Sequence, residues 1–186
     1  MNTSKLPQDN QEQLTEQGFV SSNIWYHGTS STLAPSIQRE GLKRSGDTQL
    51  NEAAVKTMAT IGNKFTQSTE PVFLTQSKSL ALYWAEQTVR ERSVRVEGTE
   101  TAVVFAITLP EALNNQVKPD VGAASLLLLK EGENFMMTLA ALYQSHNLNA
   151  PQIDLKGADR LEYLNKLAMA YIDNDIPAEH IKLLNS

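Results

Sequence analysis

One stretch of nine residues limits most strongly what this chain can fold into. Residues 101–109 read Thr-Ala-Val-Val-Phe-Ala-Ile-Thr-Leu, and Pro110 follows them. The run is rich in β-branched residues and is apolar at successive positions, so both faces of the strand that it predicts must be covered. Proline cannot donate to a strand ladder and ends the run. We therefore expect a strand in the centre of a sheet.

The rest of the chain alternates strand and helix signals around this run. We expect strands over 23–27 and 70–75 and a last short strand near the C-terminus. A short helix over 33–40 should stop at Gly41, and Ser77 should cap a second helix. Apolar residues at helical spacing predict two further helices over 134–145 and 159–172. This order predicts an α+β protein.

Length and composition indicate one domain. The chain has 186 residues, and its first twenty are almost all polar. We expect a polar N-terminal tail over 1–20 and a single domain over 21–186. No secretory signal is visible, and the longest aliphatic run, Leu126 to Leu129, is too short to span a bilayer. With no cysteine in the chain, these features favour a cytoplasmic protein without a membrane partner, and a monomer is the default expectation.

Charge and motif searches exclude several function classes. The net charge of −5 disfavours sequence-independent binding of nucleic acid. Two small basic groups, Lys43/Arg44 and Arg90/Arg92/Arg95, could form a local patch, but a solvated charged face explains them better. Phosphate-loop, dinucleotide-fold, nucleophile-elbow and zinc-protease motifs are missing, and the three histidines lie far apart. No metal site is expected.

A strand end with unusual chemistry opens the domain. Ile24, Trp25 and Tyr26 favour a strand, which runs into His27-Gly28-Thr29. Glycine lets a ligand approach the backbone closely. A histidine at that point can form a hydrogen bond with a sugar hydroxyl or an amide, although a single histidine is more often structural.

Four features in one order carry a family resemblance. They are the aromatic-His-Gly-Thr-Ser strand end, a short helix closed by Glu40-Gly41-Leu42, the run 72–75 leading into Leu80-Ala-Leu-Tyr-Trp-Ala, and the apolar strand 103–110. Together they resemble the ADP-ribosyltransferase fold, in its diphtheria-toxin/PARP-like His–Tyr–acid branch. The small rifampin ADP-ribosyltransferases and the RNA 2′-phosphotransferases have a similar opening. The resemblance covers about residues 23–110, is weak over 111–172 and returns faintly at the end.

The resemblance implies a split two-sheet β core with outer helices and a helix-rich C-terminal half, and NAD as a substrate in a cleft between the sheets. His27 would bind a ribose hydroxyl of NAD, and the Gly28 backbone would read the nicotinamide carboxamide. Tyr83 would lie against the nicotinamide ring, although a core-facing aromatic explains it equally well. Further contacts to NAD are implied for Tyr26, Thr29, Ser30, Phe73 and Thr75. Phe73 stands where the family often has tyrosine, and Thr75 could instead cap the following helix.

The carboxylate that the family needs is not clearly supplied. Breaking the nicotinamide–ribose bond builds positive charge on the ribose, which an acid stabilises. The family takes this acid from a late strand or, in the rifampin-modifying branch, from a position after the central strand. Glu162 is the nearest late candidate, although periodicity puts it on a helix, and Asp120 resembles the alternative position. We favour Glu162 slightly, and a surface role explains either residue equally well.

Three functions follow from the resemblance. The first is a mono-ADP-ribosyltransferase that transfers ADP-ribose from NAD to an unidentified acceptor (a protein, a nucleic acid or a small molecule) and releases nicotinamide. The second is a catalytically inactive domain that binds NAD, ADP-ribose or a protein partner. The third is an RNA 2′-phosphotransferase, which ranks last because the short N-terminal segment cannot supply a separate lobe. An enzyme is favoured over a binding module.

Overall fold

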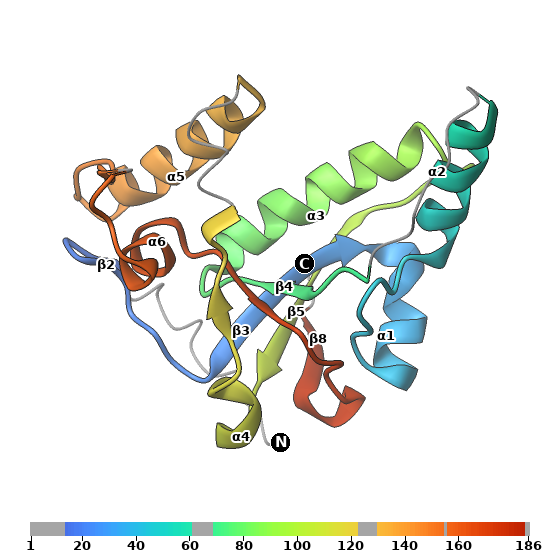
Figure 1. Ribbon diagram of the computed structural model, residues 1–186, viewed down its shortest axis with the longest axis horizontal. Coiled ribbons are helices and arrows are strands. Elements are labelled where there is room, and N and C mark those ends of the chain that lie inside the picture. The colour runs from blue at the N-terminus through green and yellow to red at the C-terminus, as the bar shows by residue number, and fades with distance from the viewer. Residues whose placement is uncertain (1–13, 61–68, 123–129, 155, 185–186) are drawn as a thin grey trace, which may run out of the picture.

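The computed structural model describes residues 14–60, 69–122, 130–154 and 156–184 (Figure 1). The strands are β1 (Leu14–Thr15), β2 (Gly18–Phe19), β3 (Ile24–Ser30), β4 (Val72–Leu74), β5 (Ala102–Thr108), β6 (Lys118–Pro119), β7 (Ala170–Ile172) and β8 (Ile181–Leu184). The helices are α1 (Ala34–Glu40), α2 (Thr48–Thr60), α3 (Lys78–Ser93), α4 (Glu111–Asn114), α5 (Glu133–Ser145) and α6 (Arg160–Leu167). Short 3₁₀ turns are η1 (Ser31–Leu33), η3 (Lys130–Gly132) and η4 (Ala178–His180). The chain is mixed α and β, as the sequence predicts.

Two three-stranded antiparallel sheets and one hairpin hold the strands. The first sheet has the order β3-β5-β8, and the second has the order β4-β7-β6. The hydrophobic strand β5 is the central strand of the first sheet, which confirms the expectation drawn from residues 101–109. Strands β1 and β2 form a separate two-stranded hairpin.

The two sheets meet at one point. Tyr26 of β3 and Thr75, just after β4, exchange two backbone hydrogen bonds, of 2.7 and 3.0 Å. This pair is an isolated bridge, so β3 and β4 separate on one side of it. The bridge therefore joins the two sheets at Tyr26, and beyond it no strand of the described ranges lies along this edge of β3.

Buried apolar side chains fill the space around both sheets. One cluster includes Trp25 from β3, Ile107 from β5, Ile172 from β7 and Ile37 from α1. The indole N–H of Trp25 donates to the side-chain oxygen of Asn114 at 2.7 Å, which satisfies its one polar group. Because residues of both sheets and α1 share this cluster, it fixes the two sheets relative to each other.

A second apolar cluster lies between α3, α5, α6 and the β1–β2 hairpin, at the left of Figure 1. Phe19 of β2 is 4% exposed and makes an edge-to-face contact with Tyr143 of α5, with ring centroids 5.9 Å apart. Leu14, Gly18 and Phe19, which fall in the segment expected to be a tail, are thus packed against the helices.

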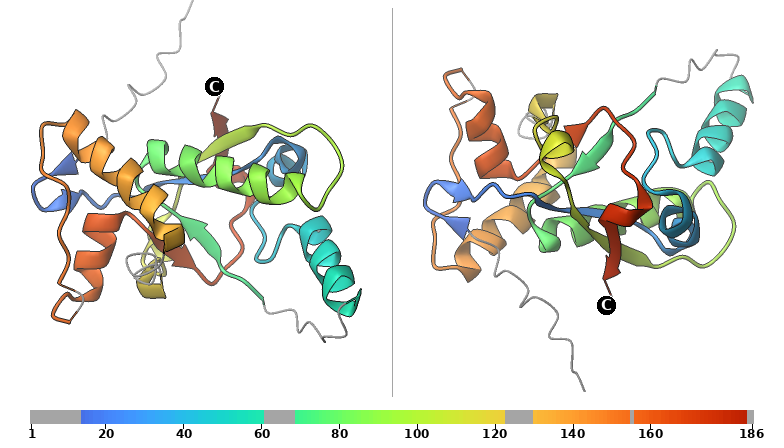
Figure 2. Two further views of the ribbon diagram at one scale, coloured as in Figure 1. Left: turned by 90° about the horizontal axis from the view of Figure 1, so that it is seen from above. Right: turned by 90° about the horizontal axis from the view of Figure 1, so that it is seen from below.

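Helix α3 lies along the first sheet and packs closely on β3 (Figures 1 and 2). Its contact positions, Ala81 and Ala85, are small and fully buried. A Cβ placed on Gly28 would lie 1.7 Å from the Ala81 carbonyl oxygen. Glycine at position 28 is therefore required by the close approach of strand and helix.

Local capping signals set the helix ends. The Ser77 hydroxyl accepts a 3.0 Å hydrogen bond from the Leu80 amide, so Ser77 is the N-cap of α3 as the sequence predicts. Gly41 ends α1 at a φ of 84°, where glycine is favoured, which confirms it as the stop of that helix.

The helix expected over 159–172 is shorter than predicted. Asp159 caps it, α6 ends at Leu167, and Ala168 takes a left-handed conformation. Residues 170–172 form β7 instead, paired with β4 on one side and β6 on the other. The apolar residues over 170–172 fit the helical spacing by coincidence, and their burial comes from sheet pairing.

Within the residues that the structure describes, no helix combines the length and hydrophobicity needed to cross a membrane.

Replacing Gly28 with alanine should destabilise the fold. The added methyl group would overlap the α3 backbone, and we expect the free energy of unfolding in urea to fall by about 3 kcal/mol. Gly98→Ala is the control, because nothing lies within 4 Å of its Cβ position and only its positive φ of 128° opposes the change. That control should cost about 1 kcal/mol. Equal losses in the two variants would contradict the close packing of β3 on α3.

Candidate functional site

Two cavities open where β3 and β4 separate. The smaller has a volume of about 450 Å³ and is lined by residues of β3, β4 and α3 and by the segment after β6. The larger has a volume of about 650 Å³ and extends toward α1 and the start of α2. Both cavities are lined by His27, Gly28, Phe73, Thr88 and Glu91. The strand end singled out by sequence therefore lies where the two cavities meet.

The half-buried imidazole of His27 bridges the gap between the separating strands. Its Nδ1 lies 2.8 Å from the backbone oxygen of Phe73. A carbonyl oxygen can only accept, so Nδ1 carries the proton, and in the neutral ring Nε2 is an acceptor. Burial lowers the pKa of His27, and the bond to Phe73 offsets part of that effect. The ring is thus held in one tautomer and favoured in its neutral form.

The backbone of Gly28 presents an open donor and acceptor to the same space. In an antiparallel ladder, the N–H and C=O groups of successive residues point to alternate edges. Tyr26 points its backbone groups away from β5, toward Thr75, so Gly28, two residues on, points to the same edge. In the described parts of the chain, no backbone or side-chain group pairs with Gly28 on that edge. An N–H and a C=O side by side match the two polar groups of a carboxamide.

One aromatic residue of the smaller cavity is not the one expected from the sequence: Trp84 lines it in place of Tyr83. Phe73, 48% exposed, lines both cavities, but Tyr83 lines neither. Tyr83 packs in the second apolar cluster, with its ring 5.9 Å from that of Phe135. Trp84, the next residue on α3, lines the smaller cavity instead. Its ring is stacked on Phe135 at 5.4 Å, which fixes its orientation.

The two candidate acids lie in different places. Asp120 follows β6, is half-buried and lines the smaller cavity together with His27. Its backbone amide donates to the Met169 carbonyl at 2.9 Å, which fixes it beside β7. Glu162 lies in the first turn of α6, where its carboxylate accepts from Lys166 at 2.5 Å, and it lines neither cavity. The structure thus brings together His27 and Asp120, and it keeps Glu162 apart from them.

Sequence reasoning missed the α3 face of the site, which includes Trp84, Thr88 and Glu91. These residues follow Ala81 on one face of the helix, at spacings of three and four residues. Glu91 lies at the rim of both cavities, and its carboxylate pairs with Arg95 at 2.8 Å. The signal that could have found this face is Gly28 itself, because a glycine packed on a helix requires small residues there.

Of the remaining residues that the resemblance implies as NAD contacts, three line a cavity and one does not. Tyr26 and Thr75 line the smaller cavity, and Thr29 lines the larger one. The Thr75 hydroxyl also accepts from the Ser77 amide at 3.2 Å. Ser30 lines neither cavity; its buried hydroxyl donates to Glu100 at 2.5 Å and caps η1. Its place is structural.

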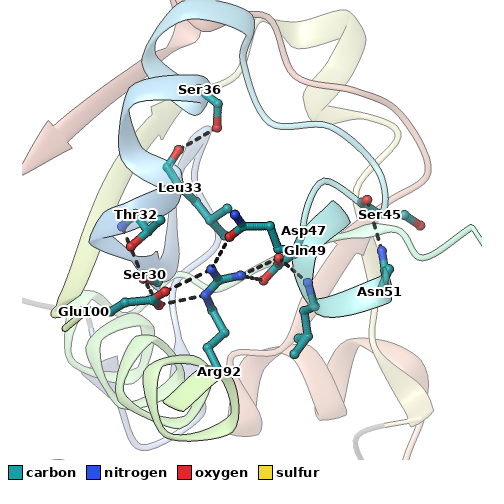
Figure 3. Close-up of polar contacts among 11 residues, drawn as sticks. Ser30, Thr32, Leu33, Ser36, Ser45, Asp47, Gln49, Asn51, Arg92 and Glu100 are labelled. Atoms are coloured by element: carbon teal, nitrogen blue, oxygen red, sulfur yellow. Dashed lines mark hydrogen bonds and ion pairs between the residues drawn. The ribbon is translucent and has the colours of Figure 1, made fainter. Parts of the chain in front are cut away.

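The sequence predicted that Arg92 lies on a solvated charged face, and for this residue the prediction is wrong. Its side chain is fully buried at the end of α3 (Figure 3). It donates to Glu100 at 2.7 and 3.0 Å, to Gln49 at 3.0 Å and to both oxygens of Asp47. These bonds raise the pKa of Arg92 and hold the pKa of Glu100 at about 2. Lone basic residues near a helix end are usually exposed, so only tertiary structure could show this buried network.

The geometry supports recognition of an amide and a hydroxyl next to an aromatic wall and a carboxylate. Within the described ranges, no three histidine, aspartate or glutamate side chains lie close enough to hold a metal ion. No lysine or arginine of the described chain lines the smaller cavity. Comparison with protein-family models, with curated proteins and with solved structures finds no match to this chain.

The protonation state of His27 should make stability depend on pH. Because burial lowers its pKa in the folded state below the ordinary value of 6.5, the unfolded chain binds a proton more readily. The free energy of unfolding should therefore decrease as the pH falls through about 6.5, and it should level off below the folded-state pKa. His27→Gln should remove this part of the pH dependence. Nitrogen NMR should show a proton on Nδ1 at pH 7.5; a proton on Nε2 instead would contradict the bond to Phe73.

Removing the Arg92 charge should destabilise the protein strongly. Arg92→Met leaves Asp47 and Glu100 partly buried without their cation, and we expect a loss of about 3–5 kcal/mol in the free energy of unfolding. Arg90→Met, on the same helix but exposed, should change it by less than about 0.5 kcal/mol. If both variants lose the same amount, the Arg92 network does not stabilise the fold.

Proposed function

We propose that this protein is a mono-ADP-ribosyltransferase that takes ADP-ribose from NAD, releases nicotinamide and passes the ADP-ribose to an acceptor. One observation carries the proposal: the open N–H and C=O groups of Gly28 lie beside His27 and Asp120 at one cavity. A carboxamide, a ribose hydroxyl and a developing positive charge are the three features of the nicotinamide riboside half of NAD. Each has a matching group here.

Gly28 and His27 would bind the ground state. The carboxamide N–H₂ donates to the Gly28 carbonyl, and the carboxamide oxygen accepts from the Gly28 amide. Nε2 of the neutral His27 ring accepts from a ribose hydroxyl, because Nδ1 already donates to Phe73. Phe73 and Trp84 offer apolar surface to the nicotinamide ring.

Asp120 would stabilise the transition state. Positive charge develops on the ribose as the bond to nicotinamide breaks, and a fixed carboxylate in a partly buried cavity stabilises it more than water does. Asp120 is favoured over Glu162 because it lines the same cavity as His27. Its backbone bond to Met169 limits its movement.

An inactive domain that binds NAD or ADP-ribose is the second candidate. Tyr83, the aromatic residue that the family resemblance implies, lines neither cavity, and no described cation of the smaller cavity faces a diphosphate. RNA 2′-phosphotransfer has less support, because phosphate chemistry needs cationic partners and no arginine among the described residues lines either cavity.

Release of nicotinamide from NAD tests the proposal. The wild-type protein should release it, and His27→Ala and Asp120→Asn should each lower kcat/KM by about 100-fold or more, since each removes a group that interacts with the reacting ribose. Glu162→Gln is the matched acid variant and should retain activity. Loss of release in Glu162→Gln, with retention in Asp120→Asn, would move the acid to α6.

The analogue of NAD with a carboxylate in place of the carboxamide tests the Gly28 contact. Its carboxylate cannot donate to the Gly28 carbonyl, so it should bind at least about tenfold more weakly than NAD. Equal binding would remove carboxamide recognition from the site.

If titration calorimetry shows that NAD binds while no nicotinamide is released, the result would support the inactive domain.

A further inference from the structure

The larger cavity is placed to hold a second molecule. Its wall is continuous with that of the smaller cavity through His27, Gly28 and Phe73 from the strands and Thr88 and Glu91 from α3. A ligand in the larger cavity would therefore contact the residues proposed to hold the reacting half of NAD. A transfer reaction requires such proximity between donor and acceptor.

The outer wall of the larger cavity is fixed by the Arg92 network. Asp47 and Gln49, at the start of α2, line the cavity and accept from the Arg92 guanidinium (Figure 3). Among the α2 side chains that the structure describes, none is buried. Asp47 also accepts from the Leu50 amide at 3.0 Å and so caps the helix. One buried guanidinium thus connects this wall to α3.

The lining charges indicate what kind of group the larger cavity takes. Glu40 of α1, Glu70 before β4 and Glu91 of α3 contribute carboxylates from three elements. Lys43 is the one basic residue among the described lining, and its ammonium pairs with Asp175 at 3.5 Å. Asp47 and Glu100 share the one positive charge of Arg92. A cationic group is favoured here, and a phosphate is disfavoured.

The carboxylates remain available to a ligand. Glu40 pairs with Arg39 and Glu91 with Arg95, but both are exposed pairs, and exposed pairs contribute little free energy. The backbone amide of Glu70 donates to the Ser45 hydroxyl, and no group in the described ranges pairs with its carboxylate. Glu70 is therefore the strongest candidate for the ligand contact.

We propose that the larger cavity is the acceptor subsite and that the acceptor presents a guanidinium or ammonium group. This inference rests on the proposed function. The attacking nitrogen loses a proton to water and gives its electron pair to the ribose carbon. The bond from that carbon to nicotinamide breaks, and nicotinamide leaves neutral with the electrons of that bond.

Agmatine, a small guanidinium compound, is the probe. With saturating NAD, we expect ADP-ribosyl-agmatine by mass spectrometry, and no product with a short single-stranded oligonucleotide. Glu70→Gln should raise the KM for agmatine about fivefold and change kcat less, because it removes one charge at the subsite. Glu86→Gln, an exposed carboxylate of α3 that lines neither cavity, is the matched control and should leave both constants unchanged.

The outcomes separate the two proposals. Nicotinamide release without ADP-ribosyl-agmatine would overturn the cationic acceptor and leave the proposed function intact, as would modification of the oligonucleotide alone. An equal effect of Glu70→Gln and Glu86→Gln on the KM would also overturn it, because the effect would then be one of overall charge. If NAD is not cleaved at all, the proposed function fails, and the acceptor subsite fails with it.

Discussion

The site depends on two strands that pair once and then separate. Tyr26 and Thr75 form the bridge between β3 and β4, and beyond it no strand in the described part of the chain pairs with this edge of β3. An open strand edge with unpaired polar groups is unfavourable when it is buried. On the facing strand β4, the carbonyl of Phe73 is satisfied by the His27 ring, which donates to it from Nδ1. The backbone groups of Gly28 have no partner on this edge among the described residues, and the proposed function assigns them to the carboxamide of NAD.

Helix α3 contacts three parts of the structure: strand β3, the smaller cavity and the start of α2. Its small residues Ala81 and Ala85 let it approach Gly28 closely, which excludes side chains from that part of the strand. The same face continues to Trp84 at the smaller cavity, and the helix ends at the buried Arg92. A shift of α3 would therefore alter the packing of β3, the aromatic wall and the start of α2 together.

Helix ends that are set by neighbouring residues could be predicted from local signals in the sequence. Ser77 and Gly41 mark helix ends because their capping contacts are local, and the apolar run of β5 predicts a central strand. Arg92 could not be predicted, because its partners Asp47 and Glu100 come from elsewhere in the chain. Tyr83 and Trp84 are adjacent aromatics, so only the register of α3 on β3 decides which one lines the smaller cavity.

The position of Asp120 depends on strand pairing between segments that are far apart in the sequence. Asp120 reaches the smaller cavity because β6 pairs with β7, and β7 pairs in turn with β4. The sequence interpretation extended α6 through 170–172, and that error removed β7, the strand that connects Asp120 to the site. With β7 assigned to the helix, the sequence interpretation slightly favoured Glu162, which lines neither cavity, over Asp120. The order β4-β7-β6 therefore brings Asp120 into the lining of the cavity that His27 also lines, and the proposed stabilisation of a positive charge depends on the second sheet.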